Sequence, residues 1–129
     1  MMPEPHAKPF VLVADDEIII ADTLAAILNL SGFEARAVYS GEEAVRVAEE
    51  MRPDVLLADV VMGGITGIEA AVLISDSLSS CKVLLLSGQA RTGDLLGIER
   101  TKGHVFNILE KPIAPKVIIR HLRGLVAAA

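Results

Sequence analysis

Short apolar runs recur along the chain, and each is followed by a stretch in which apolar residues return with the period of an α-helix. This alternation predicts a parallel sheet, because parallel strands need crossover connections and helices supply them. The five predicted strands begin near Phe10, Glu34, Val55, Lys82 and Val105. Nearly all-apolar runs are typical of strands that are buried on both faces. We therefore expect an α/β fold with a doubly wound, five-stranded parallel sheet between two layers of helices.

Apolar stripes define the faces that the outer helices turn to the sheet. The first helix is expected from about Ile18 to Leu30, and the last helix starts after Pro112. A helix over about 92–102 is weaker, because its two glycines each lower helix propensity by about 1 kcal/mol relative to alanine. The stripes are Ile20, Leu24, Ile27 and Leu28 in the first helix and Val117, Ile118, Leu122 and Leu125 in the last.

Two of the remaining helices carry a start signal. Ser40 with Glu43, and Thr66 with Glu69, each fit a capping box, in which side chains satisfy the free N–H groups of the first turn. We expect helices to begin directly after Ser40 and Thr66.

Composition and charge limit the kind of protein. A chain of 129 residues with 52% hydrophobic and 22% charged residues fits one folded domain, which we expect over residues 10–129 after a flexible N-terminal arm at 1–9. No apolar stretch approaches the roughly 20 residues that cross a membrane. The net charge of -5 comes without a basic cluster, and the single cysteine, Cys81, cannot form an internal disulfide. These features predict a cytoplasmic protein without membrane association or direct binding to nucleic acid.

Polar side chains follow four of the five predicted strands. Asp15 and Asp16 follow the first strand, Asp59 the third, Ser87 the fourth and Lys111 the fifth. In a sheet of order 2-1-3-4-5, ligands bind in the crevice at the carboxyl ends of strands 1 and 3. Adjacent strands lie about 4.8 Å apart, so carboxylates there repel one another unless a divalent cation or shared protons neutralise them. Oxygen ligands favour a hard cation, and we expect Mg²⁺.

The same residues suit phosphoryl transfer, with Asp59 as the nucleophile. A metal ion can neutralise charge on the transferring oxygens while the hydroxyl of Ser87 and the ammonium of Lys111 bind the others. This chemistry requires no general base.

Taken together, these residues resemble the receiver domain of bacterial two-component response regulators, over about Phe10 to Val126. The resemblance rests on five features in register with the β/α units: Asp15-Asp16, the isolated Asp59, Gly67 eight residues later, Ser87, and the dipeptide Lys111-Pro112. It implies a flavodoxin-like three-layer sandwich with strand order 2-1-3-4-5.

The resemblance also implies a phosphorylated switch rather than a turnover enzyme. A sensor histidine kinase or a histidine phosphotransfer protein would donate the phosphoryl group to Asp59, and the domain would catalyse only its own phosphorylation and dephosphorylation. The implied Mg²⁺ ligands are Asp15, Asp16, Asp59 and the backbone carbonyl of Val61. The surface of the helix over 92–102, the last strand and the last helix would then change for an effector protein, for an output domain outside this sequence, or for a second copy in a homodimer.

Near the last predicted strand the chain departs from the family pattern. Ile108 stands three residues before Lys111, where an aromatic switch residue is common in the family, and Phe106 stands two residues earlier. Side chains alternate along a strand, so Phe106 and Ile108 share a face. Our hypothesis is that Phe106 is the switch residue, near the Lys111-Pro112 dipeptide that matches the family.

The segment after Asp59 also departs from that pattern. Gly63 and Gly64 follow Met62, where proline is common in the family, which predicts a softer loop. Val61 and Gln89 occupy the positions that tune hydrolysis in receivers. The side chain of Val61 cannot orient water, and we predict a long-lived phosphorylated state.

Other functions remain open at this level. A Mg²⁺-dependent phosphohydrolase with an aspartyl nucleophile would normally carry a second carboxylate two residues after the nucleophile, where this chain has Val61, and a cap for its substrate. A nucleotide-binding or flavin-binding module would use the same crevice, but no glycine-rich phosphate loop follows the first strand. An unphosphorylated receiver-like scaffold is a further alternative.

Overall fold

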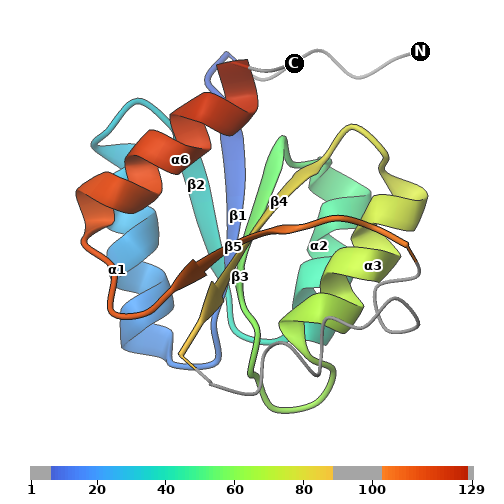
Figure 1. The fold of residues 1–129 in the computed structure, drawn as a ribbon. Helices are drawn as coiled ribbons and strands as arrows, with labels where there is room; N and C mark the ends of the chain where they lie inside the picture. The colour runs from blue at the N-terminus through green and yellow to red at the C-terminus, as the bar shows by residue number, and fades with distance from the viewer. Residues whose placement is uncertain (1–6, 89–102, 128–129) are drawn as a thin grey trace.

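The computed structural model describes residues 7–88 and 103–127, and it contains a five-stranded parallel sheet of order β2-β1-β3-β4-β5 (Figure 1). The strands are β1 (Phe10–Ala14), β2 (Glu34–Val38), β3 (Val55–Asp59), β4 (Lys82–Ser87) and β5 (Asn107–Glu110). The described helices are α1 (Ile18–Asn29), α2 (Gly41–Met51), α3 (Gly67–Ser77) and α6 (Pro115–Ala127). The predicted doubly wound, flavodoxin-like fold is confirmed. The helix predicted over 92–102 lies outside the described residues.

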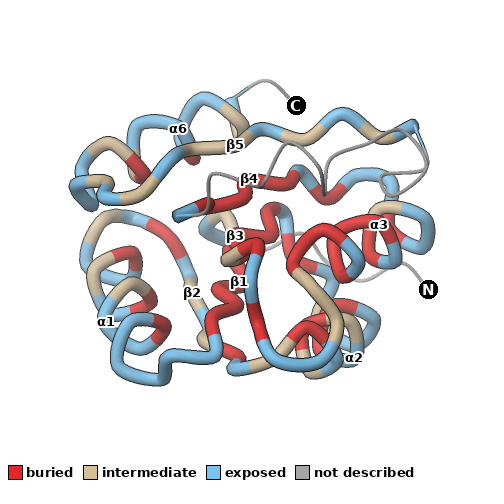
Figure 2. The backbone as a smooth tube through the Cα atoms, turned by 60° about the horizontal axis from the view of Figure 1, so that its bottom comes forward, coloured by how far each residue is buried: buried red, intermediate tan, exposed pale blue. Residues whose placement is uncertain are grey.

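The helices form one layer on each face of the sheet. Figure 1 shows α1 and α6 on one face and α2 and α3 on the other. Alternation along β1 divides the core accordingly, because Leu12 belongs to the cluster under α2 and α3, whereas Val11 and Val13 belong to the cluster under α1 and α6. Figure 2 shows that burial is concentrated in the central strands β1, β3 and β4. In the described parts of the chain, no helix combines the length and apolar character needed to span a membrane.

One local prediction was wrong, and another was right only in part. The last strand begins at Asn107 rather than near Val105, and the Val105 side chain is 95% exposed. Of the stripe predicted for α1, Leu28 is buried and Leu24 packs against the core, but Ile20 is 38% exposed, and Ala21 and Ala25 are buried instead. The small alanines let the helix backbone approach the sheet closely, so the larger isoleucines are displaced to the rim.

The two predicted capping boxes differ in detail. Thr66 and Glu69 form the complete box at the start of α3, with both side-chain-to-backbone hydrogen bonds at 3.1 Å. At the start of α2, Ser40 accepts from the Glu43 N–H at 3.0 Å, but Glu43 accepts instead from the N–H of Tyr39 at 2.8 Å. At α2 the Glu43 side chain therefore accepts from the residue before the N-cap rather than from the N-cap itself, although the helix begins where predicted.

Candidate functional site

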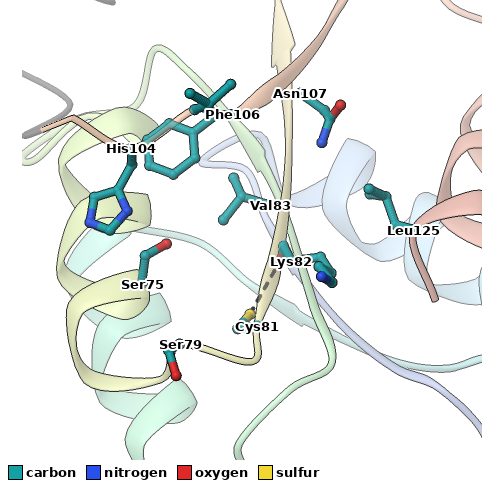
Figure 3. Close-up of a pocket in the computed structure, with 10 residues that line it drawn as sticks. Ser75, Ser79, Cys81, Lys82, Val83, His104, Phe106, Asn107 and Leu125 are labelled. Atoms are coloured by element: carbon teal, nitrogen blue, oxygen red, sulfur yellow. Dashed lines mark hydrogen bonds between the residues drawn. The ribbon is translucent and has the colours of Figure 1, made fainter. Parts of the chain in front are cut away.

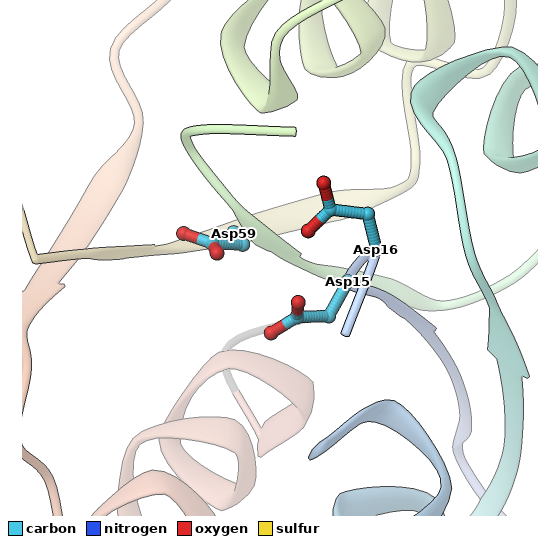
Figure 4. A group of neighbouring side chains, drawn as sticks. All are labelled: Asp15, Asp16 and Asp59. Atoms are coloured by element: carbon cyan, nitrogen blue, oxygen red, sulfur yellow. The ribbon is translucent and has the colours of Figure 1, made fainter. Parts of the chain in front are cut away.

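Three carboxylates gather at the carboxyl ends of β1 and β3. The parallel pairing of Ala14 with Ala58 sets these two strand ends side by side, so Asp15 and Asp16 emerge next to Asp59 (Figure 4). Each side chain offers one oxygen, and these oxygens all lie within 4.8 Å of one another. Oxygens so grouped are the ligands that a hard divalent cation prefers, and this cluster could hold one.

Asp15 is the buried member of the cluster, with a relative exposure of 2%. Its Oδ1 accepts a hydrogen bond from the N–H of Glu17 at 2.9 Å, whereas its buried Oδ2 accepts none from any described residue. Burial is the main cause that raises the pKa of Asp15, and the negative charge of Asp59 adds to it, against the opposing effects of the Glu17 N–H and of Lys111. A buried carboxylate oxygen without a hydrogen-bond donor is costly, and a cation in the cluster would relieve this cost.

Lys111 provides the positive charge of the site. Its Nζ donates to Asp59 Oδ2 at 3.2 Å and lies 3.8 Å from Asp15 Oδ2. The lysine is placed by the end of β5, where its backbone N–H donates to the carbonyl of Ser87 at 2.8 Å and the following peptide bond to Pro112 is cis. Lys111 therefore links two of the three carboxylates.

Ser87 lies at the end of β4 and is 3% exposed. Its neighbour in the sheet is Glu110, directly before Lys111, so the hydroxyl-bearing residue and the lysine belong to adjacent strand ends. The predicted carboxylates, hydroxyl and ammonium group thus lie at the carboxyl ends of four neighbouring strands, β1, β3, β4 and β5.

Gly67 explains how the backbone behind Asp59 is packed. The N–H of Gly67 donates to the carbonyl of Val60 at 2.9 Å. A Cβ at position 67 would lie 2.9 Å from the carbonyl carbon of Asp59 and closer still to its oxygen. Only glycine allows the first turn of α3 to sit against the end of β3 in this way.

A pocket of about 410 Å³ opens over the cluster and is lined by Asp16, Glu17, Asp59, Val61, Gly88 and Lys111. Val61 is 45% exposed at its rim. The carboxylate of Asp16 is exposed and accepts a hydrogen bond from the N–H of Gly63 at 3.1 Å. The sequence analysis missed this donor, because a backbone N–H has no signature in residue type.

The residues predicted to act as a switch lie elsewhere. Phe106 and Ile108 both pack against the core cluster under α2 and α3, in agreement with their shared face. Phe106 stacks on the ring of His104 with centroids 5.7 Å apart, and His104 Nε2 lies 2.8 Å from Asp76 Oδ1. Neither Phe106 nor Ile108 lines the carboxylate pocket.

Phe106 instead borders a separate pocket of about 470 Å³ near the amino end of β4 and the end of α3, and the buried Cys81 also lines this pocket (Figure 3). Pro112 is exposed, and Gln89 lies outside the described residues. The structure therefore separates Phe106 from the acidic cluster by most of the length of β4.

The comparisons with known proteins identify the class. Residues 11–123 match the model of the response regulator receiver domain, and the chain belongs to this family. It is 30% identical over 116 residues to the DNA-binding response regulator MtrA of Mycobacterium tuberculosis, which covers 88% of this chain and 49% of MtrA. The chain spans about half the length of the curated relatives it matches, as this value shows.

Solved structures agree with this assignment. The chemotaxis protein CheY4 of Vibrio cholerae has a TM-score of 0.81 and 25% identity, covering 92% of this chain and 99% of CheY4. The response regulator TrrA of Thermotoga maritima, solved in complex with Mg²⁺-BeF, has a TM-score of 0.77 and 25% identity, covering 90% of this chain and 97% of TrrA. Receiver domains are generally not classical enzymes, which weighs against the phosphohydrolase alternative.

One prediction about partners requires correction. The expectation of no direct binding to nucleic acid is contradicted, because matched relatives such as MtrA are DNA-binding response regulators, of which this chain covers only the receiver-domain half. The net charge of -5 describes only the surface of the receiver domain. Its charge carries no information about what the remaining half of such a protein binds.

Proposed function

We propose that this chain is the receiver domain of a two-component response regulator in which Asp59 accepts a phosphoryl group from the phosphohistidine of a sensor histidine kinase. The observation that carries the proposal is the arrangement of Asp59, which is partly exposed, beside two further carboxylates and within 3.2 Å of Lys111 Nζ. An isolated surface aspartate would have no such surroundings.

Asp15, Asp16, Asp59 and the backbone carbonyl of Val61 would hold Mg²⁺. Two observations support the fit: the grouped carboxylate oxygens and the buried Asp15 Oδ2, which has no hydrogen-bond donor among the described residues. When bound, the ion supplies positive charge that offsets both the carboxylates and the oxygens of the phosphoryl group.

The chain's own groups then carry the transfer. An Asp59 oxygen attacks phosphorus while the bond from phosphorus to the donor's imidazole nitrogen breaks, and the electron pair of that bond returns to the imidazole. Lys111, already donating to Asp59 Oδ2, balances the charge of the acyl phosphate, and the Ser87 hydroxyl binds a phosphoryl oxygen. No side chain has to remove a proton from the attacking carboxylate.

The output follows from the relatives. We propose that phosphorylation alters the surface of β5, α6 and the segment 92–102, with Phe106 as the responding aromatic, and that this change controls a DNA-binding output as the name of MtrA indicates for that protein. The cytoplasm is where such a regulator would act. The side chain of Val61, which lines the pocket, cannot orient water, so we expect a long-lived phosphoryl group, and a half-life in the range of seconds would contradict this expectation.

Acetyl phosphate with Mg²⁺ provides the test, because intact mass spectrometry detects a phosphoryl adduct directly. The adduct is expected in the wild type and absent in Asp59→Asn. Asp54→Asn is a matched control, since Asp54 lies at the other end of β3, where its carboxylate accepts from the N–H of Phe10 at 2.7 Å and an asparagine oxygen can replace it. A wild type without an adduct would refute phosphorylation and favour the scaffold, whereas sustained phosphate release from many substrates would favour the hydrolase.

A further inference from the structure

The segment from Gly63 to Ile65 is tied to α2 on one side and to the acidic cluster on the other. The N–H of Ile65 donates to Glu42 Oε2 at 3.3 Å. Gly41 lies against the same segment so closely that a Cβ there would be 2.5 Å from Ile65 Cγ1. Gly64 has a φ of 79°, and a Cβ on it would collide with the Glu42 carboxylate. The first turn of α2 thus dictates the path of this segment.

The other end of the segment meets Asp16. The N–H of Gly63 donates to Asp16 Oδ2 at 3.1 Å, across 47 residues of sequence. Asp16 is exposed, so the packed core does not hold its carboxylate, in contrast with that of Asp15. An exposed carboxylate that lacks a fixed donor samples several rotamers, and ordering it for a ligand has an entropic cost.

We propose that the Gly63 N–H is a positioning group for cation binding: it holds the Asp16 carboxylate toward Asp15 and Asp59, and Glu42 keeps the N–H in place through Ile65. This inference rests on the Mg²⁺ site of the proposed function. Partners that orient a metal ligand commonly change metal affinity by about 10–100-fold when they are removed. Because this hydrogen bond is exposed to solvent, we expect its removal to weaken metal affinity by about tenfold, the lower end of that range.

Two substitutions at the same residue isolate the N–H group. Alanine keeps it, and a Cβ at position 63 would have only Asp16 Oδ2 within 4 Å, at 3.9 Å, which is ordinary contact. Proline removes it. Titration calorimetry of the metal-free full chain with MgCl₂ should give an affinity close to wild type for Gly63→Ala and about tenfold weaker for Gly63→Pro. Equal affinities for the two folded variants, or tighter binding by Gly63→Pro, would overturn the proposal.

A second pair of variants tests the role of Glu42 independently, in case Gly63→Pro does not fold. Glu42→Gln keeps a side-chain oxygen that can accept from Ile65 but removes the charge, whereas Glu42→Ala removes both. The proposal expects weaker Mg²⁺ binding in Glu42→Ala and near wild-type binding in Glu42→Gln. Equal weakening in both would show that only the charge near the cation matters and would overturn the anchoring role. Glu49→Gln, on the same helix, is the control for charge alone.

The readouts separate this inference from the proposed function. Asp59 phosphorylation is measured by mass, and Mg²⁺ affinity is measured without a phosphodonor. A wild type that is phosphorylated but shows no difference between Gly63→Ala and Gly63→Pro would refute only the positioning role. A wild type that binds no Mg²⁺ would refute both.

Discussion

Replacing Gly67 by alanine should damage the fold at the point where Asp59 is held. A Cβ at position 67 would lie 2.9 Å from the carbonyl carbon of Asp59 and 3.1 Å from the Cα of Val60, and both are backbone atoms. Side chains can rotate away from an intruding methyl group, but strand backbone inside a sheet cannot. The first turn of α3 and the end of β3 must therefore separate.

The size of the effect follows from the packing. Overpacking in a core typically costs about 1–3 kcal/mol, and the backbone contacts place Gly67→Ala at about 3 kcal/mol. With a urea dependence of about 1–3 kcal/mol per molar, the unfolding midpoint should fall by about 1 M or more. Any folded fraction should also be phosphorylated more slowly, because Asp59 moves with its backbone.

Gly124→Ala is the matched control. Gly124 lies in α6, and a Cβ on it would have no heavy atom within 4 Å, so alanine there should raise stability by about 0.5–1 kcal/mol through helix propensity. Urea unfolding followed by circular dichroism measures both variants. If the two glycine substitutions shift the midpoint in the same direction, the packing argument for Gly67 is refuted.

Further predictions concern stability, pH and reactivity. Thr66→Ala removes the hydroxyl that accepts from the Glu69 N–H and should lower the free energy of unfolding by about 1 kcal/mol, while Thr66→Ser keeps the acceptor; equal losses in the two variants would contradict the capping role. Burial raises the pKa of Asp15, so the folded protein favours the protonated carboxyl group. The stability that this preference contributes is complete below pH 3.8, the ordinary pKa, and is lost as the pH rises through the raised pKa. In EDTA, Asp15→Asn should therefore unfold at a higher temperature than the wild type at pH 7, and the difference should shrink toward pH 4; no difference at pH 7 would refute this. Burial raises the pKa of the Cys81 thiol to about 12, so Ellman's reagent at pH 8 should label the protein rapidly only in guanidinium, and rapid labelling of the native protein would disprove the burial argument.

Much of the fold could be predicted because its signals are local. The observed starts of β1, β2, β3 and β4 at Phe10, Glu34, Val55 and Lys82 coincide with the predicted starts, and β1, β3 and β4 are nearly all apolar and buried. A strand buried on both faces must be apolar along its length, and that requirement is visible in a few consecutive residues. The boundary of β5 was misjudged because Val105, an apolar residue, is nevertheless exposed.

The residue types of the candidate site were also visible in sequence, because polar side chains directly after apolar runs are conspicuous. Their individual surroundings were not. Asp15 and Asp16 are neighbours in the chain, yet one is 2% exposed and has an oxygen without a hydrogen-bond donor among the described residues, whereas the other is exposed and accepts from Gly63. The contacts of Gly63 and Glu42 were likewise hidden, since the Gly63 N–H donates to Asp16 and the Glu42 carboxylate accepts from the N–H of Ile65, and a backbone N–H has no signature in residue type.

By itself, the sequence determined the β/α order, the class of fold and the set of chemical groups at the strand ends, because each depends on residues within one or two turns of each other. Only the tertiary structure decided which carboxylate loses its water, which oxygen Lys111 reaches and which N–H meets Asp16. These properties depend on segments that lie 47 to 96 residues apart in sequence, as the contacts of Asp16 with Gly63 and of Asp15 with Lys111 illustrate. The hydration of a charged group is set by everything packed around it, and a local pattern of residues does not contain that information.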